Sequence, residues 1–163
     1  MQAFATGLLI TLLLTLSSCG FSLRGSDALA AQFSTLSLDL EQANSELSRQ
    51  LRRSLDVAEV AISRDGGGDI PTLSLRNERV ISRPVSVNPR ARAAQYEIRL
   101  SVDISLLQGQ SILIDQETLQ IQRSYYEDIE NIAGNQEEIA IITAEMRRDL
   151  VNLVIRRLEA VAG

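Results

Sequence analysis

Alternating apolar and polar residues mark four segments of this chain as β-strands. Between residues 96 and 106 every even position is apolar and every odd position is polar, which is typical of a strand with one buried face. The same period of two appears in residues 36–40 and, less regularly, in residues 73–87. A fourth run, about 111–126, follows the turn candidate 108–110, so we expect it to pair antiparallel with the strand before it.

The segment 73–87 fits the alternation least well. Arg79 and Arg83 interrupt an apolar set that otherwise occupies odd positions, namely Leu73, Leu75, Ile81, Val85 and Val87. We therefore expect a long, imperfect strand.

The fourth predicted strand has a polar face without charges. Its even positions carry Gln116, Thr118, Gln120, Gln122 and Ser124. The apolar residues Leu119, Ile121 and Tyr125 belong to the opposite face. A polar face of this kind suits contact with water or with a polar lumen, and the pattern does not choose between the two.

Two segments have the period of a helix instead. Leu47, Leu51 and Leu55 recur every fourth residue with arginines between them, which predicts an amphipathic helix. A longer final helix is predicted at about residues 136–160, with a core stripe and a second apolar set. The second set indicates either a wide buried face beneath a neighbouring helix or a contact outside the chain's own sheet. It consists of Ile141, Val151 and Ile155.

The predicted elements follow one another as strand, helix, strands and helix. This order predicts an α/β (α+β) two-layer sandwich, in which two helices pack on one face of a mixed four-stranded sheet. The first strand-helix-strand unit is expected to cross over in the right-handed sense. No repeat, low-complexity tract or linker divides residues 20–163, so we expect one domain.

The amino terminus has the features of an export signal. The apolar run at residues 8–16 is shorter than the roughly 20 residues that a spanning helix needs, but it fits the core of a signal peptide. The following sequence Leu16-Ser17-Ser18-Cys19 resembles the lipobox at which bacterial lipoproteins are lipidated and cleaved. A cleaved ordinary signal with a free thiol is the alternative.

We accordingly assign residues 1–18 to a lipoprotein signal peptide and residues 19–32 to the lipidated Cys19 and a tether. Residues 33–163 form the folded domain in this assignment. Residue 20 is glycine and not aspartate, which favours the outer membrane over the inner membrane. More than one acyl chain on Cys19 would make the attachment essentially permanent.

Composition excludes several function classes. The 21 acids exceed the 16 bases, all of which are arginine, and this balance argues against nucleic-acid binding. The absence of histidine and the single cysteine remove most metal sites, the common nucleophile systems and any internal disulfide. We expect no catalytic residue, metal or cofactor. A small hydrolase with two carboxylates stays open as an alternative, and it requires two acids within roughly 10 Å in a pocket.

Several short segments, in collinear order, resemble the lipopolysaccharide-assembly lipoprotein family LptE, also called RlpB. The opening resembles the family's lipidated cysteine followed by glycine, an aromatic residue, a variable residue, leucine and arginine. The resemblance extends to the first helix, the strands and the last helix. The segments are Cys19-Gly20-Phe21-Ser22-Leu23-Arg24-Gly25, Leu47-Ser48-Arg49, Pro71-Thr72-Leu73, Ala94-Gln95-Tyr96, Arg123-Ser124-Tyr125-Tyr126 and Arg156-Arg157-Leu158.

The resemblance implies a non-enzymatic lipoprotein, anchored in the outer membrane and facing the periplasm. It implies a protein that plugs and helps assemble the LptD β-barrel and takes part in delivering lipopolysaccharide to the outer leaflet. For contact with lipopolysaccharide the candidates are Arg90 and Arg92, two guanidinium groups that suit lipid phosphates. A solvated loop without a ligand is the alternative there. The alternative function is another outer-membrane lipoprotein that binds lipid as an auxiliary transport component, without a barrel partner.

Overall fold

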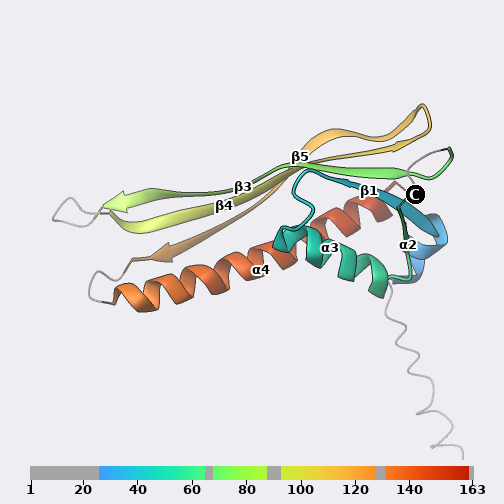
Figure 1. Cartoon of the computed structure of the whole chain (residues 1–163). Coiled ribbons are helices and arrows are strands. Elements are labelled where there is room, and N and C mark those ends of the chain that lie inside the picture. The colour runs from blue at the N-terminus through green and yellow to red at the C-terminus, as the bar shows by residue number, and fades with distance from the viewer. Residues whose placement is uncertain (1–25, 65–67, 88–92, 128–130, 162–163) are drawn as a thin grey trace, which may run out of the picture.

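A mixed sheet and three helices make up the part of the chain that the computed structural model describes, residues 26–64, 68–87, 93–127 and 131–161 (Figure 1). The elements, in chain order, are α2 (Ser26–Gln32), β1 (Thr35–Leu40), α3 (Glu46–Val57), β2 (Ala61–Ser63), β3 (Thr72–Val87), β4 (Ala93–Gln108), β5 (Ser111–Tyr126) and α4 (Ile132–Glu159). Within these residues no helix is both long and apolar enough to cross a bilayer.

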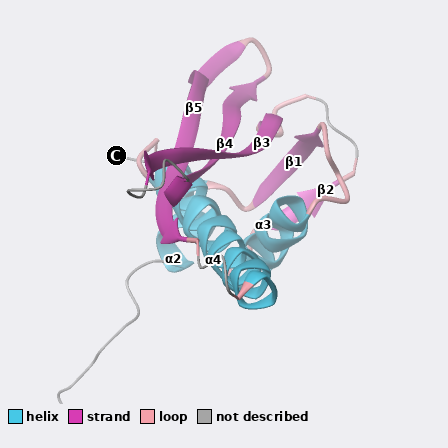
Figure 2. Ribbon diagram, turned by 90° about the vertical axis from the view of Figure 1, so that its left-hand side faces the viewer, coloured by secondary structure: helices cyan, strands magenta, loops and turns pink. Residues whose placement is uncertain are grey.

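The strands lie in the order β2-β1-β3-β4-β5. β1 is parallel to both β2 and β3, whereas β3, β4 and β5 form an antiparallel meander. The helices lie on one face of this sheet, so the predicted α+β two-layer class is confirmed (Figures 1 and 2). The predicted number of four strands is wrong, because Ala61–Ser63 adds a fifth beside β1. Three residues are too few for an alternating pattern to reveal them as a strand.

One row of side chains on β4 forms the centre of the core. These side chains are at most 1 % exposed and point toward the helices: Ile98, Leu100, Val102, Ile104 and Leu106. The predicted leucine stripe of α3 packs against the same core, since Leu47, Leu51 and Leu55 are buried. α3 begins where Ser45 accepts a hydrogen bond from the backbone N–H of Ser48 at 3.1 Å, an N-cap that satisfies one open donor.

The longest helix, α4, begins at Ile132, four residues before the predicted start. The Asn131 side chain caps it by accepting from the Gly134 N–H at 3.1 Å. Val151 is buried and Ile155 is partly buried, and α3 packs against α4. The interpretation as a wide stripe beneath a neighbouring helix is therefore correct for these two residues. Ile141, in contrast, is 54 % exposed.

A short helix occupies part of the segment that we assigned to a tether. In α2 the side chain of Leu29 is fully buried, and Phe33 just after the helix joins the same core. The backbone N–H of Phe33 donates to the Leu29 carbonyl at 2.7 Å, which continues the last helical turn. Two core residues four positions apart are too few to show a helical period in the sequence.

A β-bulge explains why β3 looked imperfect. The register with β4 shifts between Arg76 and Arg79, and Asn77 adopts a positive φ of 54°. The N–H of Asn77 donates to Glu41 Oε2 at 2.6 Å. The bulge changes which positions face the helices, so Leu75 is buried but Ile81 faces away from them and is exposed. The arginines that interrupted the apolar set therefore lie on the outer face.

We expect Leu100→Ala to lower the free energy of unfolding by about 3 kcal/mol, because it deletes buried methyl groups from a fully enclosed site. Urea unfolding of the purified protein measures this change. The exposed position Ser124 provides the control, since Ser124→Ala is expected to change the same quantity by less than about 0.5 kcal/mol. Equal effects at both positions would contradict the assignment of the core.

Candidate functional site

The face of the sheet that points away from the helices is uncovered in the described part of the chain (Figure 2). We call it the open face. Cross-strand pairing brings onto it Arg76, Arg79, Ile81 and Arg83 of β3, Glu97, Arg99, Ser101, Asp103 and Ser105 of β4, and Thr118, Gln120, Gln122 and Ser124 of β5. The predicted uncharged face of the fourth strand is confirmed, since every one of its five residues is exposed.

Charged contacts on the open face run from strand to strand. Glu97 Oε1 lies 2.9 Å from Arg83 Nη2 on β3 and 3.3 Å from Arg99 Nη2 on β4 itself. The side-chain amide of Gln122 on β5, oriented with its oxygen toward Arg99, accepts hydrogen bonds from Arg99 Nη2 and Nε at 3.1 and 3.0 Å. These contacts hold the two guanidinium groups in place while more than a third of each side chain stays exposed.

The Asp103 carboxylate ties the three strands together near the bulge. It accepts from Thr118 Oγ1 at 2.6 Å and from Asn77 Nδ2 at 2.8 Å. The hydrogen bonds from Thr118 and then Asn77, with a smaller contribution from the charge of Arg79, lower the pKa of Asp103 below its ordinary value. The carboxylate is therefore ionised over the whole neutral range.

The open face carries an excess of positive charge. It has four arginines but three acids, Glu97, Asp103 and Asp39 of β1, whereas the chain as a whole carries a formal net charge of −5. Asp39 pairs with Arg76, so three arginines of the face remain for Glu97 and Asp103. Arginine forks with exposed donors favour partners rich in carbonyl, carboxylate or phosphate oxygens.

The end of β3 and the start of β4 lie at the far end of the long strands from β1 and β2 (Figure 1). At this end Tyr96 and Tyr125 stack with ring centroids 5.4 Å apart. Tyr126 and Ile132 nearby in sequence are 70 % and 66 % exposed. The predicted lipid-contact residues Arg90 and Arg92 belong to the connection between these strands but lie outside the described residues, as does the predicted lipidation site Cys19.

A second surface lies between the two main helices. A groove of about 720 Å³ runs along the contact between α3 and α4, and its lining includes Arg53, Arg148, Val57, Val151 and Ile155. A single acid, Glu159, borders it. The hollow that Glu41 and Glu78 border has a volume of about 10 Å³, too small for a substrate. Neither of these two hollows combines room for a substrate with the paired acids that the hydrolase alternative requires.

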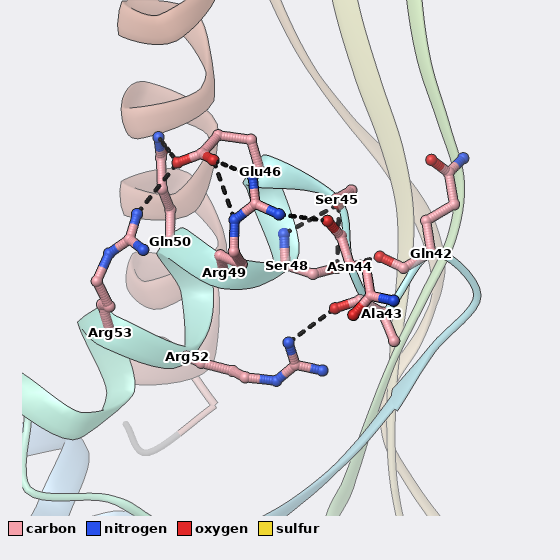
Figure 3. Close-up of polar contacts among 10 residues, drawn as sticks. All are labelled: Gln42, Ala43, Asn44, Ser45, Glu46, Ser48, Arg49, Gln50, Arg52 and Arg53. Atoms are coloured by element: carbon pink, nitrogen blue, oxygen red, sulfur yellow. Dashed lines mark hydrogen bonds and ion pairs between the residues drawn. The ribbon is translucent and has the colours of Figure 1, made fainter.

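The carboxylate of Glu46 organises the first turns of α3 (Figure 3). It accepts from Arg49 Nε at 3.1 Å, from Gln50 at 3.3 Å and from Arg53 at 3.2 Å. Hydrogen bonds from Arg49, Gln50 and Arg53, in that order, lower the pKa of Glu46 from 4.5 to about 2. Arg52 instead donates to the Ala43 carbonyl at 2.7 Å. The cluster stabilises the start of the helix.

Sequence reasoning missed the open-face role of Arg79, Arg83 and Arg99. The two β3 arginines were interpreted as interruptions of an apolar face. This interpretation assumed that the alternation of apolar and polar positions continues unchanged past the bulge. The signal in the sequence was the run of four polar residues Arg76-Asn77-Glu78-Arg79. Such a run breaks the alternation of a strand with one apolar face and indicates a bulge. Arg99 was assigned to the polar, solvent-facing side of the segment 96–106, and no partner was predicted for it.

Solved structures show that this fold is that of small bacterial lipoproteins. The rare lipoprotein B from Shewanella oneidensis superimposes with a TM-score of 0.71 at 23 % identity, covering 77 % of this chain and 94 % of that one. The lipoprotein B from Nitrosomonas europaea gives a TM-score of 0.70 at 19 % identity, covering 86 % and 91 %.

Sequence comparison identifies the family. Residues 33–158 match the lipopolysaccharide-assembly family LptE, and the chain belongs to this family. Among its relatives, the LPS-assembly lipoprotein LptE of Photorhabdus laumondii is 27 % identical over 92 % of this chain and 85 % of that protein. The protein of the same description from Pectobacterium atrosepticum is 28 % identical, over 90 % and 80 %. The suspected resemblance is confirmed, and the family is one of non-enzymatic lipoproteins.

The low pKa of Glu46 predicts an acid-dependent loss of stability. Because the folded-state pKa lies below 4.5, the unfolded chain takes up the proton first, so stability falls as the pH drops from about 4.5 to about 2. Urea unfolding of the wild type and Glu46→Gln at pH 6, 4 and 2.5 measures this. The variant is expected to be less stable at pH 6, with the difference shrinking toward pH 2.5. A difference independent of pH would contradict the assignment.

Proposed function

We propose that this protein is an outer-membrane lipoprotein that occupies the lumen of an LptD-type β-barrel, helps to assemble that barrel and takes part in delivering lipopolysaccharide to the outer leaflet. The open face is the observation that carries the proposal. Large outer-membrane barrels have polar interiors, so a protein that fills one needs a broad polar surface on a rigid support. Membership of the LptE family supports the same role.

The chemistry of the open face suits such a lumen. Its β5 side offers hydroxyl and amide groups, which both donate and accept hydrogen bonds, and its β3 side offers arginine forks. The face is backed by the tightly packed β4 row, so its side chains are presented without rearrangement of the sheet. A pre-organised polar surface loses little conformational entropy when it docks.

The proposed anchor is Cys19, lipidated after removal of residues 1–18. Ser26, the first residue of α2, follows it by seven positions, a span of at most about 25 Å when extended. The acyl chains would therefore hold the folded domain close to the periplasmic surface of the outer membrane. A barrel in the same membrane is within reach of a domain tethered so closely.

We further propose that Arg90 and Arg92 contact the phosphates of lipopolysaccharide. Their segment joins the end of β3 to the start of β4, at the end of the sheet that has the tyrosine stack and the exposed Tyr126. Guanidinium groups suit the phosphates of such an amphiphile, and an exposed aromatic side chain such as Tyr126 suits its acyl chains.

The barrel proposal predicts co-purification in nearly equal amounts. Tagged protein, extracted gently from its native outer membrane, is expected to bring down one β-barrel per lipoprotein, quantified by stained gels and mass spectrometry. Arg79→Glu/Arg83→Glu on the open face is expected to reduce the recovered barrel by about tenfold, roughly 1.4 kcal/mol, since it places carboxylates where the guanidinium groups stood.

Arg148→Glu/Arg156→Glu on α4 is the matched control, because it reverses two exposed charges on the helix layer. It is expected to retain the barrel. Recovery of the lipoprotein alone from wild-type membranes would contradict the barrel role and favour an auxiliary lipid-binding lipoprotein. Equal loss in both charge-reversed variants would contradict the role of the open face.

The lipid proposal predicts that Arg90→Ala/Arg92→Ala weakens binding of fluorescently labelled lipopolysaccharide by about tenfold or more, since charge-assisted hydrogen bonds contribute about 1.5–3 kcal/mol each. Binding is measured by anisotropy, with Arg148→Ala/Arg156→Ala as the control that keeps net charge equal. A change below twofold in the first variant, or an equal change in both, would contradict the assignment.

A further inference from the structure

The groove along the contact between α3 and α4 is a surface that the proposed barrel and lipid contacts leave unused. Both helices contribute aliphatic side chains to its lining, namely Val57 from α3 and Val151 and Ile155 from α4. Val57 is 78 % exposed. A large aliphatic side chain that is so exposed beside other apolar residues is typical of a surface that another molecule covers. The helices lie on the side of the sheet opposite the open face, so the two surfaces can be used at the same time (Figure 2).

The two ends of this groove carry opposite charges. α3 and α4 run in the same direction, so both helices end at the same end of the groove (Figure 1). Arg148 lines the other end, and the guanidinium of Arg53 also lies there, because it reaches back along α3 to within 3.2 Å of Glu46. Glu159 lines the end at which the helices finish, about 16 Å along α4 from Arg148. In the described part of the chain Glu159 has no ion-pair partner.

Both arginines keep donors for a further partner. The Arg148 side chain is 66 % exposed, and its Nη2 lies 3.8 Å from Glu145 Oε1, which is a long ion pair. The Arg53 side chain is 62 % exposed and uses Nη2 for Glu46. A guanidinium has five N–H donors, so each of these groups can bind a second acceptor in the groove without losing its present one.

This charge pattern matches a third helix that runs in the opposite direction to α3 and α4. A helix carries partial positive charge at its N-terminus and partial negative charge at its C-terminus. An antiparallel helix in the groove would place its N-terminus beside Glu159 and beside the last carbonyls of α3 and α4. Its C-terminus would lie beside Arg53 and Arg148, where acidic side chains would also be stabilised.

The same pattern argues against the acyl chain of an anionic lipid. A lipid phosphate would suit the arginine end, but the apolar end of the chain would then lie beside the carboxylate of Glu159. Covering a carboxylate with hydrocarbon removes its hydration and supplies no hydrogen bond in return. A helix N-terminus, in contrast, supplies open N–H donors at that position.

We propose that the groove between α3 and α4 binds one amphipathic helical segment of a different protein, antiparallel to both helices. Its apolar side contacts Val57, Val151 and Ile155, and acidic residues at its C-terminal end bind Arg53 and Arg148. The segment has about three turns, to match the 16 Å between the charged ends of the groove, and its apolar residues recur at helical spacing. A helix this short is marginal alone in water, so the segment belongs to a folded protein or folds when it docks.

Photo-crosslinking of the full-length protein in intact cells tests the occupant and its direction. Benzoylphenylalanine in place of Val57 is expected to cross-link the N-terminal half of one helical segment of another protein. The same group in place of Glu145, one turn before Arg148, is expected to cross-link the C-terminal half of that segment. Mass spectrometry of the cross-linked peptides identifies both halves. Ile132 is the matched control position, since it is 66 % exposed but lies about 24 Å before Arg148 on α4, where no cross-link to this segment is expected.

Charge reversal provides a second measurement. Arg53→Glu/Arg148→Glu is expected to lower the yield of the cross-link at position 57 about tenfold, because carboxylates would then face the acidic end of the segment. Arg64→Glu/Arg156→Glu is the matched control, since it reverses two exposed arginines that do not line the groove, and it is expected to change the yield by less than twofold. Circular dichroism of the purified variants checks that both are folded.

Cross-links from both positions to one amphipathic segment in the stated direction, lost on charge reversal in the groove alone, support the proposal. A cross-link to a lipid, to a second copy of this chain or to the β-barrel would overturn it. A segment in the opposite direction, equal loss in both charge-reversed variants, or no cross-link at all would also overturn it. The inference does not rest on the barrel role, and the groove variants leave the open face unchanged. Recovery of the barrel is therefore expected to stay the same in them, so the two proposals fail separately.

Discussion

The register of β4 between its two neighbours is the constraint on which the rest of the structure depends. Its even positions are buried beneath the helices and its odd positions face outward. A slip by one residue would turn Glu97, Arg99 and Asp103 into the core and the buried aliphatic row into solvent. Burial of that row thus fixes where every charged group of the open face stands, and the polar contacts across the strands follow from it.

The two faces of the sheet have different physical tasks. Apolar burial on the helix side supplies stability without regard to direction, whereas the ion pairs of the open face are exposed and contribute little stability. These ion pairs instead fix the orientation of the side chains on the open face. Glu97 holds Arg83 and Arg99, and Asp103 holds Thr118 and Asn77, so these side chains are fixed relative to the sheet. A partner of this face meets polar groups that are already in position.

Sequence patterns predicted the parts of this fold that are long and periodic. The alternation of β4 and the leucine repeat of α3 each recur several times along the chain, so they can be recognised in the sequence without the structure. The patterns failed where a few residues decide the structure. β2 has three residues, α2 contributes Leu29 to the core with Phe33 just after it, and at Asn77 a single left-handed residue changes which positions of β3 face the helices.

The candidate site was less predictable for the same reason. The uncharged face of β5 could be derived because it obeys the period of one strand. The arginine-rich part of the open face arises from the pairing of three strands and from the bulge, and neither is encoded in a local pattern. Arg90, Arg92 and Cys19 were selected by residue type and by resemblance, and they stay predictions because they lie outside the described residues.

The unequal lengths of the two layers give the molecule two distinct ends. α3 has 12 residues and covers the sheet near β1, whereas α4 has 28 and follows β5 along its length (Figure 1). α2 lies at the end with β1 and β2, whereas β3 ends and β4 begins at the other. Strands of 16 residues separate these ends by up to about 50 Å, more than the roughly 30 Å hydrocarbon thickness of a bilayer. A rigid sheet of this length, tethered at one end, can therefore present its other end to a lipid at a different depth in the membrane from its own anchor.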